Sequence, residues 1–266
     1  MGPLITLTTD FGLSDYDVGV LTGVIWGIAP GARVIDLSHE ISRHNVLEAA
    51  LLLERCTPYF PAGTIHLVVV DPGVGTQRRL LAARLGDQGF VGPDNGLLTP
   101  LLQRAQAADA SVEIVCLDQP RFWLPRVSPI FHGRDIFAPA AGHLAAGVPL
   151  GDLGTPIDDP LLLEFPQPER TRSGWRGLVM HVDAFGNLST NLERRHFQPE
   201  QGIVIDLLGR RIEGLVRTFG QGHPGQLVAL FDSSGKLSIC VVNGDAAVAL
   251  GARVGDPIEV SLTDVR

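Results

Sequence analysis

Two patterns of apolar positions alternate along the first 150 residues. Short apolar, β-branched runs are typical of buried strands, and between them apolar residues recur at helical spacing. The strand-like runs cover residues 4–9, 33–38, 64–70, 80–85, 89–96 and 112–118, and the helical segments cover residues 17–29, 45–56 and 134–147. This alternation predicts an α/β domain with a Rossmann-like, mainly parallel sheet and helices on both faces.

The pattern changes after a proline-rich stretch. Residues 156–175 hold four prolines and mixed charge, which is typical of a linker. The strand-like runs that follow, separated by glycine-rich turns, cover residues 176–183, 202–209, 211–219, 226–232, 236–242 and 257–264. We therefore predict an N-terminal α/β domain at 1–160, a linker at 161–175 and a smaller all-β, barrel-like domain at 176–266.

Composition narrows the class of protein. The 266 residues include 29 acidic and 21 basic side chains, a net charge of −8, which disfavours a nucleic-acid partner. No apolar run reaches the roughly 18 residues of a membrane helix, and no signal peptide is evident. Cys56, Cys116 and Cys240 are widely spaced in apolar runs, as expected for free thiols in a reducing compartment. We expect a cytoplasmic protein.

Aspartates follow several predicted strands. Asp10, Asp36 and Asp71 lie at or near strand ends, with Asp15 and Asp17 shortly after the first. Ligands of open α/β sheets bind beyond the carboxyl ends of the strands, so these acids predict a shared rim. A carboxylate-rich pocket suits a cation, a metal ion, or hydroxyl and amino donors. Each aspartate is also a common cap for the turn or helix that follows it.

The sequence DPGVGTQRR, residues 71–79, has the glycines of a phosphate-binding loop but lacks its Gly-Lys-Ser/Thr. The loop is short enough for Arg78 to fold back onto Asp71. Gly73 and Gly75 allow close approach of the backbone, and amides beside an arginine can hold an anion or hydroxide. The alternative is an ordinary stabilising ion pair.

Two further segments carry weaker signals. His132 stands in FHGRDIF, before a glycine and a predicted helix, where a core or surface role is the common alternative. The segment VDAFGNLSTN, residues 182–191, ends a strand with an acid and an aromatic residue before Gly-Asn. Alone, it indicates only a turn.

Five segments in order resemble the S-adenosyl-L-methionine (SAM) hydroxide adenosyltransferases, relatives of the fluorinase and chlorinase. They are TTDFGLSD, VVDPGVGT.RR, VGPDNGLLTP, FHGRDIFAP and D.FGN..TN, spread over essentially the whole chain. The resemblance implies a Rossmann-like domain, a β-barrel domain and a homotrimer. Each active site would lie between the N-terminal domain of one subunit and the C-terminal domain of its neighbour. It also implies hydrolysis of SAM to adenosine and methionine, and we expect no cofactor and no metal.

The resemblance assigns roles to the catalytic candidates. Asp71, Arg78 and His132 match the Asp-Arg-His set that distinguishes the hydrolases from the halogenases. The halogenases carry Tyr where this chain has Asp71, and Ser or Gly where it has Gly133. A carboxylate at position 71 would repel a halide.

The resemblance also implies substrate-binding residues. Asp10 matches an aspartate that accepts hydrogen bonds from both ribose hydroxyls. The remaining matches are Asp15 and Asp183 near the methionine amino group, Ser233 near its carboxylate, and Phe185 and Asn187 on the adenine side.

Three positions depart from the family pattern. His44 stands where relatives usually carry Phe or Trp against the nucleoside, and Asn45 where they usually have Asp. Asp245 stands where relatives often have Asn. We therefore expect an adenine pocket that differs in detail.

The chemistry is consistent with this set of residues. Attack of water at C5′ expels neutral methionine, so the step needs a nucleophile rather than an acid, and bulk water has a pKa of about 15.7. Arg78 would favour hydroxide, while Asp71 and His132 orient the water and one of them takes its proton. The alternatives are a metal-dependent phosphohydrolase, a SAM-dependent halogenase, and a non-catalytic SAM or nucleoside sensor.

Overall fold

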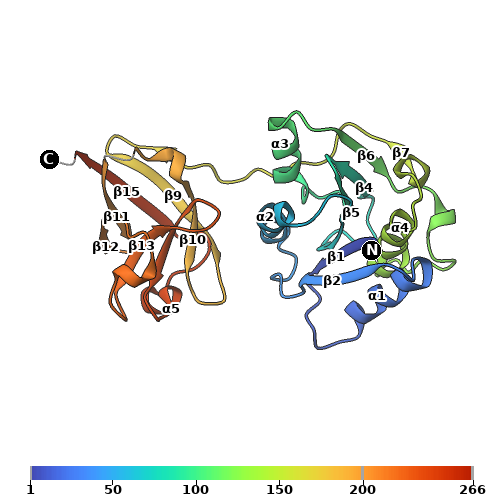
Figure 1. The fold of residues 1–266 in the computed structure, drawn as a ribbon, viewed down its shortest axis with the longest axis horizontal. Coiled ribbons are helices and arrows are strands. Elements are labelled where there is room, and N and C mark those ends of the chain that lie inside the picture. Colours follow the sequence, from blue (N-terminus) through green and yellow to red (C-terminus); the bar gives the residue numbers. More distant parts are fainter. Residues whose placement is uncertain (1, 199–200, 265–266) are drawn as a thin grey trace. The chain divides into compact units, whose positions relative to one another are not determined.

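The computed structural model describes residues 2–198 and 201–264. The chain divides into two compact units, residues 1–164 and 165–266, and each is described by itself (Figure 1). None of the helices in the described part of the chain has the length and apolar character that crossing a lipid bilayer demands.

The first unit is built on a seven-stranded sheet within residues 4–156, in the order β2-β1-β3-β5-β4-β6-β7. The strands are β1 (Leu4–Thr9), β2 (Arg33–Ser38), β3 (Ile65–Val69), β4 (Leu80–Leu85), β5 (Gln88–Pro93), β6 (Val112–Cys116) and β7 (Thr155–Pro156). Parallel pairing joins β2, β1, β3 and β5, and β4 pairs antiparallel with both β5 and β6. Five of these strands therefore run in one direction, which confirms the mainly parallel sheet.

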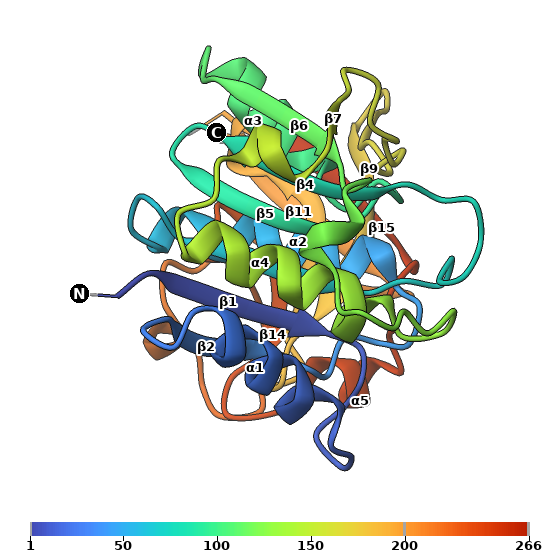
Figure 2. The same cartoon turned by 90° about the vertical axis from the view of Figure 1, so that its right-hand side faces the viewer.

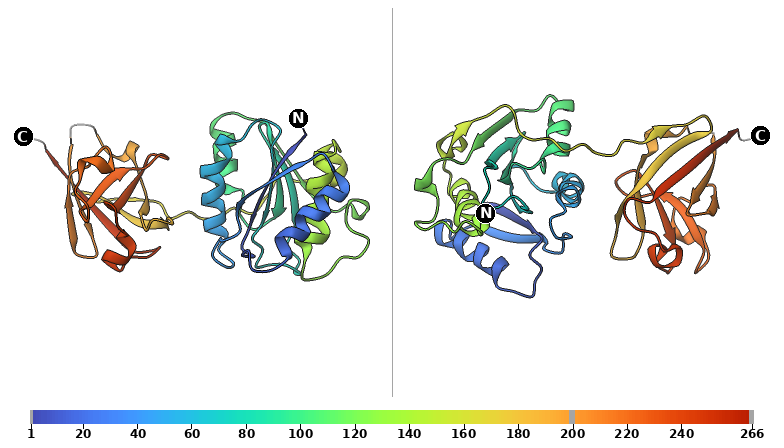
Figure 3. Two further views of the ribbon diagram at one scale, coloured as in Figure 1. Left: turned by 60° about the horizontal axis from the view of Figure 1, so that its bottom comes forward. Right: turned by 180° about the vertical axis from the view of Figure 1, so that it is seen from behind.

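Helices cover both faces of this sheet, as predicted (Figure 3). The helices α1 (Asp17–Ile28) and α4 (Ala138–Ala145) lie side by side on one face (Figure 2). The helices α2 (Val46–Cys56) and α3 (Thr99–Ala107) cover the other. Buried aliphatic side chains of each pair pack against the strands, because a sheet buried on both faces needs an apolar cover on each.

Two helical features differ from the prediction. The segment expected as one helix from 134 begins as a π-helix, Gly133–Phe137, and continues as α4. Helix α3 was not predicted, because its nine residues are too few to show a clear helical period. The short 3₁₀ turns of this unit are η1 (Thr57–Tyr59), η2 (Pro120–Phe122) and η4 (Leu150–Leu153).

The second unit is an antiparallel sheet in the order β12-β11-β15-β9-β10-β14-β13, with β8 paired to β9. Its strands are β8 (Glu169–Arg170), β9 (Gly174–Val182), β10 (Leu188–Glu193), β11 (Gln201–Leu207), β12 (Arg210–Glu213), β13 (Leu227–Phe231), β14 (Lys236–Val241) and β15 (Pro257–Asp264). The edge strands β12 and β13 contact each other, so the sheet curls into a nearly closed barrel. One apolar cluster fills it.

Short helical elements complete the second unit. They are η5 (Arg194–His196), η6 (Phe219–Gln221) and α5 (Ala246–Leu250). The strand predicted at 211–219 ends at Glu213, because Gly214 turns the chain with a φ of 75°.

Candidate active site

The candidate site lies where the order of the sheet switches. Strand β1 pairs with β2 on one side and β3 on the other, and Thr9 is opposite Val69. The residues after β1 and β3 therefore emerge next to each other, at the place where open α/β sheets bind ligands. A cavity of about 550 Å³ opens there, and Asp10, Asp17 and Asp71 give it three carboxylates. Arg43, His44, Phe131 and His132 are also in its lining.

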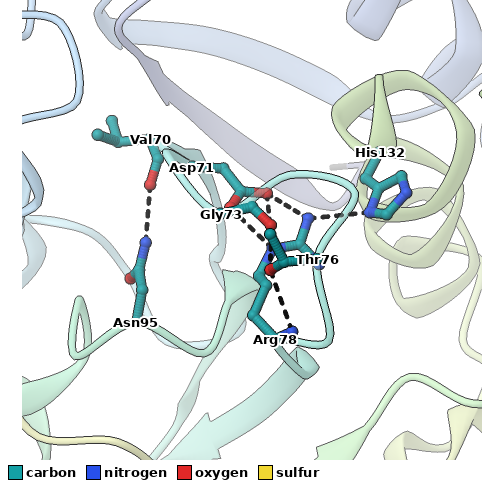
Figure 4. Close-up of polar contacts among 7 residues, drawn as sticks. All are labelled: Val70, Asp71, Gly73, Thr76, Arg78, Asn95 and His132. Carbon is teal, nitrogen blue, oxygen red and sulfur yellow. Dashed lines mark hydrogen bonds and ion pairs between the residues drawn. The ribbon is translucent and has the colours of Figure 1, made fainter. Parts of the chain in front are cut away.

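Arg78 folds back onto Asp71, as the loop length predicts. Its Nε donates to both carboxylate oxygens, at 2.7 and 2.9 Å, and its Nη2 donates to Oδ2 (Figure 4). The two side chains are 8 % and 6 % exposed, so this pair is largely withdrawn from water. Gly75 has a φ of 78°, and a Cβ there would lie 2.5 Å from the carbonyl oxygen of Pro129, so the loop requires glycine.

His132 completes the cluster from a separate segment. Arg78 Nη2 lies 2.9 Å from His132 Nδ1. A guanidinium only donates hydrogen bonds, so Nδ1 is the acceptor and the proton of the neutral ring is on Nε2. Burial, together with the Arg78 charge, lowers the pKa of His132. The geometry thus joins a carboxylate, a guanidinium and a neutral imidazole.

Asp135 supports the segment that carries His132. It lies in the π-helix, is fully buried, and accepts a hydrogen bond from Ser128 N at 2.7 Å and from Arg134 Nε at 2.6 Å. These bonds fix the loop that lines the cavity around Phe131. Asp135 is not among the residues predicted for the site, although π-helical turns within helices often mark functional sites.

Asp10 enters the same cavity with its carboxylate held in place. Oδ2 accepts a hydrogen bond from His44 N at 2.9 Å. His44 has a φ of 65°, a left-handed conformation that is uncommon for a residue other than glycine. His44, which stands where relatives usually carry Phe or Trp, is therefore also the residue whose backbone N–H donates to Asp10.

Two other acids lie outside this lining. Asp36, expected at the same rim, lies within β2 opposite Leu7, and its Oδ1 is 3.1 Å from His39 Nε2. The expectation for Asp36 is wrong, because its carboxylate contacts His39 and is not part of the cavity lining. Asp15 is exposed in the loop before α1 and accepts from Tyr16 N, while Asp17 lines the cavity.

The candidates in the second unit form a tight turn between β9 and β10. Asp183 Oδ1 accepts from Phe185 N and Asn187 N, both at 2.9 Å, and Oδ2 accepts from Asn187 Nδ2 at 2.9 Å. Gly186 has a φ of 78° and packs against Asp245. This turn leaves the Phe185 side chain 76 % exposed.

Ser233 lies exposed in the turn between β13 and β14. Its neighbour Asp232 anchors that turn, accepting from Ser189 Oγ at 2.8 Å and Ser234 Oγ at 2.6 Å. Burial raises the pKa of the Asp232 carboxyl, but hydrogen bonds from Ser234 and Ser189 outweigh it and hold that pKa below its usual value. Among the residues that the structure describes, no group of three or more His, Cys, Asp or Glu side chains is placed to hold a metal ion.

Fold and site together define a class of two-domain proteins. The α/β domain holds a carboxylate–guanidinium–imidazole cluster beside a cavity that Asp71 and His132 line, and a β-barrel-like domain follows it in the chain. Comparison with known protein families identifies the family within this class. Residues 5–154 match the SAM hydroxide adenosyltransferase N-terminal domain, and residues 177–259 match its C-terminal domain. The chain belongs to the SAM hydroxide adenosyltransferase family.

Similar proteins agree with this assignment. The chain is 39 % identical, over 97 % of its length and 98 % of the relative's, to a protein of Salinispora tropica named (R)-S-adenosyl-L-methionine hydrolase. It is 40 % identical to a Thermus thermophilus protein of the same name, over 98 % of this chain and all of the other. An uncharacterized conserved protein of Thermotoga maritima superposes with a TM-score of 0.88 at 36 % identity, covering 97 % of this chain and 99 % of its own.

Proposed function

We propose that this protein hydrolyses S-adenosyl-L-methionine to adenosine and L-methionine. The observation that carries the proposal is Arg78, held between Asp71 and His132 Nδ1 beside an acid-lined cavity. Its relatives with 39 and 40 % identity are named for this activity.

The cavity suits this substrate in size and charge. Its volume of about 550 Å³ falls within the roughly 300–1,000 Å³ typical of small-molecule sites. SAM carries a sulfonium and an ammonium group, which the carboxylates of Asp10 and Asp17 attract, whereas Asp71 is paired with Arg78. Asp10 accepts hydrogen bonds from the ribose diol, and the His44 N–H keeps its carboxylate oriented.

The reaction is a direct displacement at C5′. The oxygen of water forms a bond to C5′ as the C5′–S bond breaks. The electron pair of the C5′–S bond goes to sulfur, which leaves as neutral methionine. The Arg78 charge stabilises the hydroxide character that develops on the attacking water. Because His132 Nδ1 already accepts from Arg78, the imidazole offers its Nε2–H to orient the water, and Asp71 takes the proton.

The second unit supplies the rest of the substrate site in this proposal. Asp183, together with Asp15, binds the methionine ammonium group, and Ser233 binds its carboxylate. Phe185 and Asn187 contact adenine, for which the exposed Phe185 ring is suited. We further propose a homotrimer whose active sites join the N-terminal domain of one subunit to the C-terminal domain of the next. Gel filtration with light scattering tests the trimer.

Domain limits and location remain predictions. The limits of 1–160 and 176–266, with a linker between them, are tested by limited proteolysis. Free Cys56, Cys116 and Cys240 support an enzyme of the reducing cytoplasm, which fractionation of cells making the protein would test.

The first experiment incubates the purified protein with SAM and no added metal or halide, and follows the products by liquid chromatography. Adenosine and methionine are expected, with the 5′ oxygen of adenosine labelled when the reaction runs in H₂¹⁸O. Tight binding without turnover would overturn the proposal in favour of a sensor. Activity abolished by a chelator and restored by a divalent metal would favour a metal-dependent hydrolase.

A further inference from the structure

We propose that Asp94 and Asn95 are positioning residues that fix both ends of the Asp71–Arg78 loop. Asn95 Nδ2 donates to the carbonyl oxygen of Val70 at 2.9 Å, directly before Asp71 (Figure 4). At the other end, Asp94 N donates to the carbonyl oxygen of Arg79 at 3.0 Å. The inference deepens the proposed hydrolysis and rests on it for its kinetic part.

The sheet explains why these two residues reach both ends. Strands β4 and β5 pair antiparallel with Leu80 opposite Pro93, so Arg79 and Asp94 form the next pair beyond the strands. The parallel pairing of β3 with β5 ends at Leu67 opposite Val91. Val70 lies beyond it, and the Asn95 amide supplies the hydrogen bond that the ladder no longer provides.

Asp94 and Asn95 are themselves firmly held. Asp94 is 2 % exposed, and its Oδ2 accepts from Arg79 Nε at 2.8 Å while Oδ1 accepts from Leu161 N at 2.8 Å. Asn95 Oδ1 accepts from Leu97 N, just before α3. The pair is therefore a rigid anchor rather than a second flexible loop.

Inside the loop, the hydrogen bonds are short-range. Val74 N donates to Asp71 O at 3.2 Å, and Thr76 N donates to Gly73 O at 3.1 Å. Such turns keep the loop's shape but do not fix its place against His132, which comes from another segment. The Arg78–His132 contact and the approach of Gly75 to Pro129 join the loop to that segment, and anchoring at Val70 and Arg79 fixes the ends from which the loop reaches them. A misplacement of about 1 Å can cost on the order of a hundredfold in rate.

Asn95→Asp tests the anchor. The substitution is isosteric, keeps the acceptor for Leu97 N and removes the donor to Val70. We expect kcat for SAM to fall at least about tenfold, KM to change far less, and amide hydrogen exchange in residues 71–78 to speed up. Gln88→Glu is the matched control, because Gln88 Nε2 also donates to backbone carbonyls, those of Thr57 and Phe60, outside the cavity.

The outcomes separate this inference from the proposed function. A wild-type protein that does not convert SAM would refute the function, and hydrogen exchange in residues 71–78 would then decide the anchor by itself. Unchanged kcat together with unchanged exchange in Asn95→Asp would overturn the anchor, as would a loss that Gln88→Glu matches. If Asn95→Asp fails to fold, Asn95→Ala, which adds no charge, takes its place with the same readouts.

Discussion

In the first unit, Arg78 and His132 are 54 residues apart and meet through a side-chain hydrogen bond, whereas in the second unit Asp183 arranges Phe185 and Asn187 within one turn. The first arrangement is largely buried and depends on the packing of separate segments; the second is local and leaves an aromatic ring exposed. Buried charge is suited to chemistry, and an exposed turn is suited to recognition. The contrast predicts that changes in the first set reduce kcat and that changes in the second weaken binding.

The largest effect is expected for Arg78→Ala. Loss of the charge that stabilises hydroxide should lower kcat by roughly 10²–10³-fold, by analogy with removal of a preorganised donor, with a smaller change in KM. Steady-state kinetics with SAM measures both. Arg84→Ala, on the exposed face of β4, is the control and should retain activity. Loss of SAM binding with unchanged turnover would move Arg78 from the chemistry to substrate recognition.

Acid should destabilise the first unit before the second. His66 is fully buried between Phe60 and Phe90, and burial lowers its pKa to about 4. A histidine in the unfolded chain has a pKa of about 6.5, so the neutral ring's stabilisation is present above pH 6.5. It is lost as the pH falls toward 4, at a cost of about 3 kcal/mol.

The depressed pKa of Asp232 acts in the same direction but at lower pH. Its contribution to the second unit is present above the ordinary aspartate value of 3.8 and is lost only as the pH falls below it. Burial also lowers the pKa of His196 in the second unit, but the fall to about 4 belongs to His66, so hydrogen exchange followed between pH 7.5 and 4 should show protection lost first in residues 2–164. His66→Gln should flatten that dependence. Loss of hydrogen-exchange protection in the second unit at a higher pH than in the first would contradict this prediction.

Asp183→Ala should act on binding. Removing the carboxylate releases the amides of Phe185 and Asn187 and, in the proposed site, unpairs the substrate ammonium. We expect KM for SAM to rise about tenfold or more, the cost of a hydrogen bond to a charged group, with kcat less affected. Asp206→Ala is matched, because Asp206 Oδ1 likewise accepts from a turn amide, that of Gly209. A larger loss in kcat than in binding would place Asp183 in the chemistry.

The smallest expected effect is a shift in the His132 titration. Burial and then Arg78 lower its pKa, so the ring should be neutral at pH 7 and titrate below 6.5. An acid limb of kcat/KM is expected in the same range, with activity lost as the pH falls. Arg78→Gln should raise the pKa of His132, because it removes the neighbouring positive charge. NMR of the carbon-bound protons of the imidazole would measure this shift. A titration above 6.5 in the unaltered protein would contradict the neutral acceptor role of Nδ1.

Much of the local structure was predictable. Patterns among neighbouring residues predict the alternation of strands and helices and the change to an all-β unit. They also predict the turn at Asp71-Pro72-Gly73. Helix α3 and the π-helix at Gly133 were not predictable, because tertiary packing overrides a weak or interrupted helical period. The strand at 33–38 was predicted with the bounds it has, but Asp36 was misplaced because the contact of its side chain with His39 is a tertiary feature that the strand pattern does not specify.

The sequence by itself determined the class of fold, the family, and the short-range geometry of residues 71–78 and 183–187, since these follow from residue types a few positions apart. Only the tertiary structure decided that Arg78 meets His132, that His44 donates to Asp10, and that Asn95 holds Val70. Such contacts join segments whose distance is set by the order of strands in the sheet. Strand order depends on the packing of the whole domain, which no local pattern encodes.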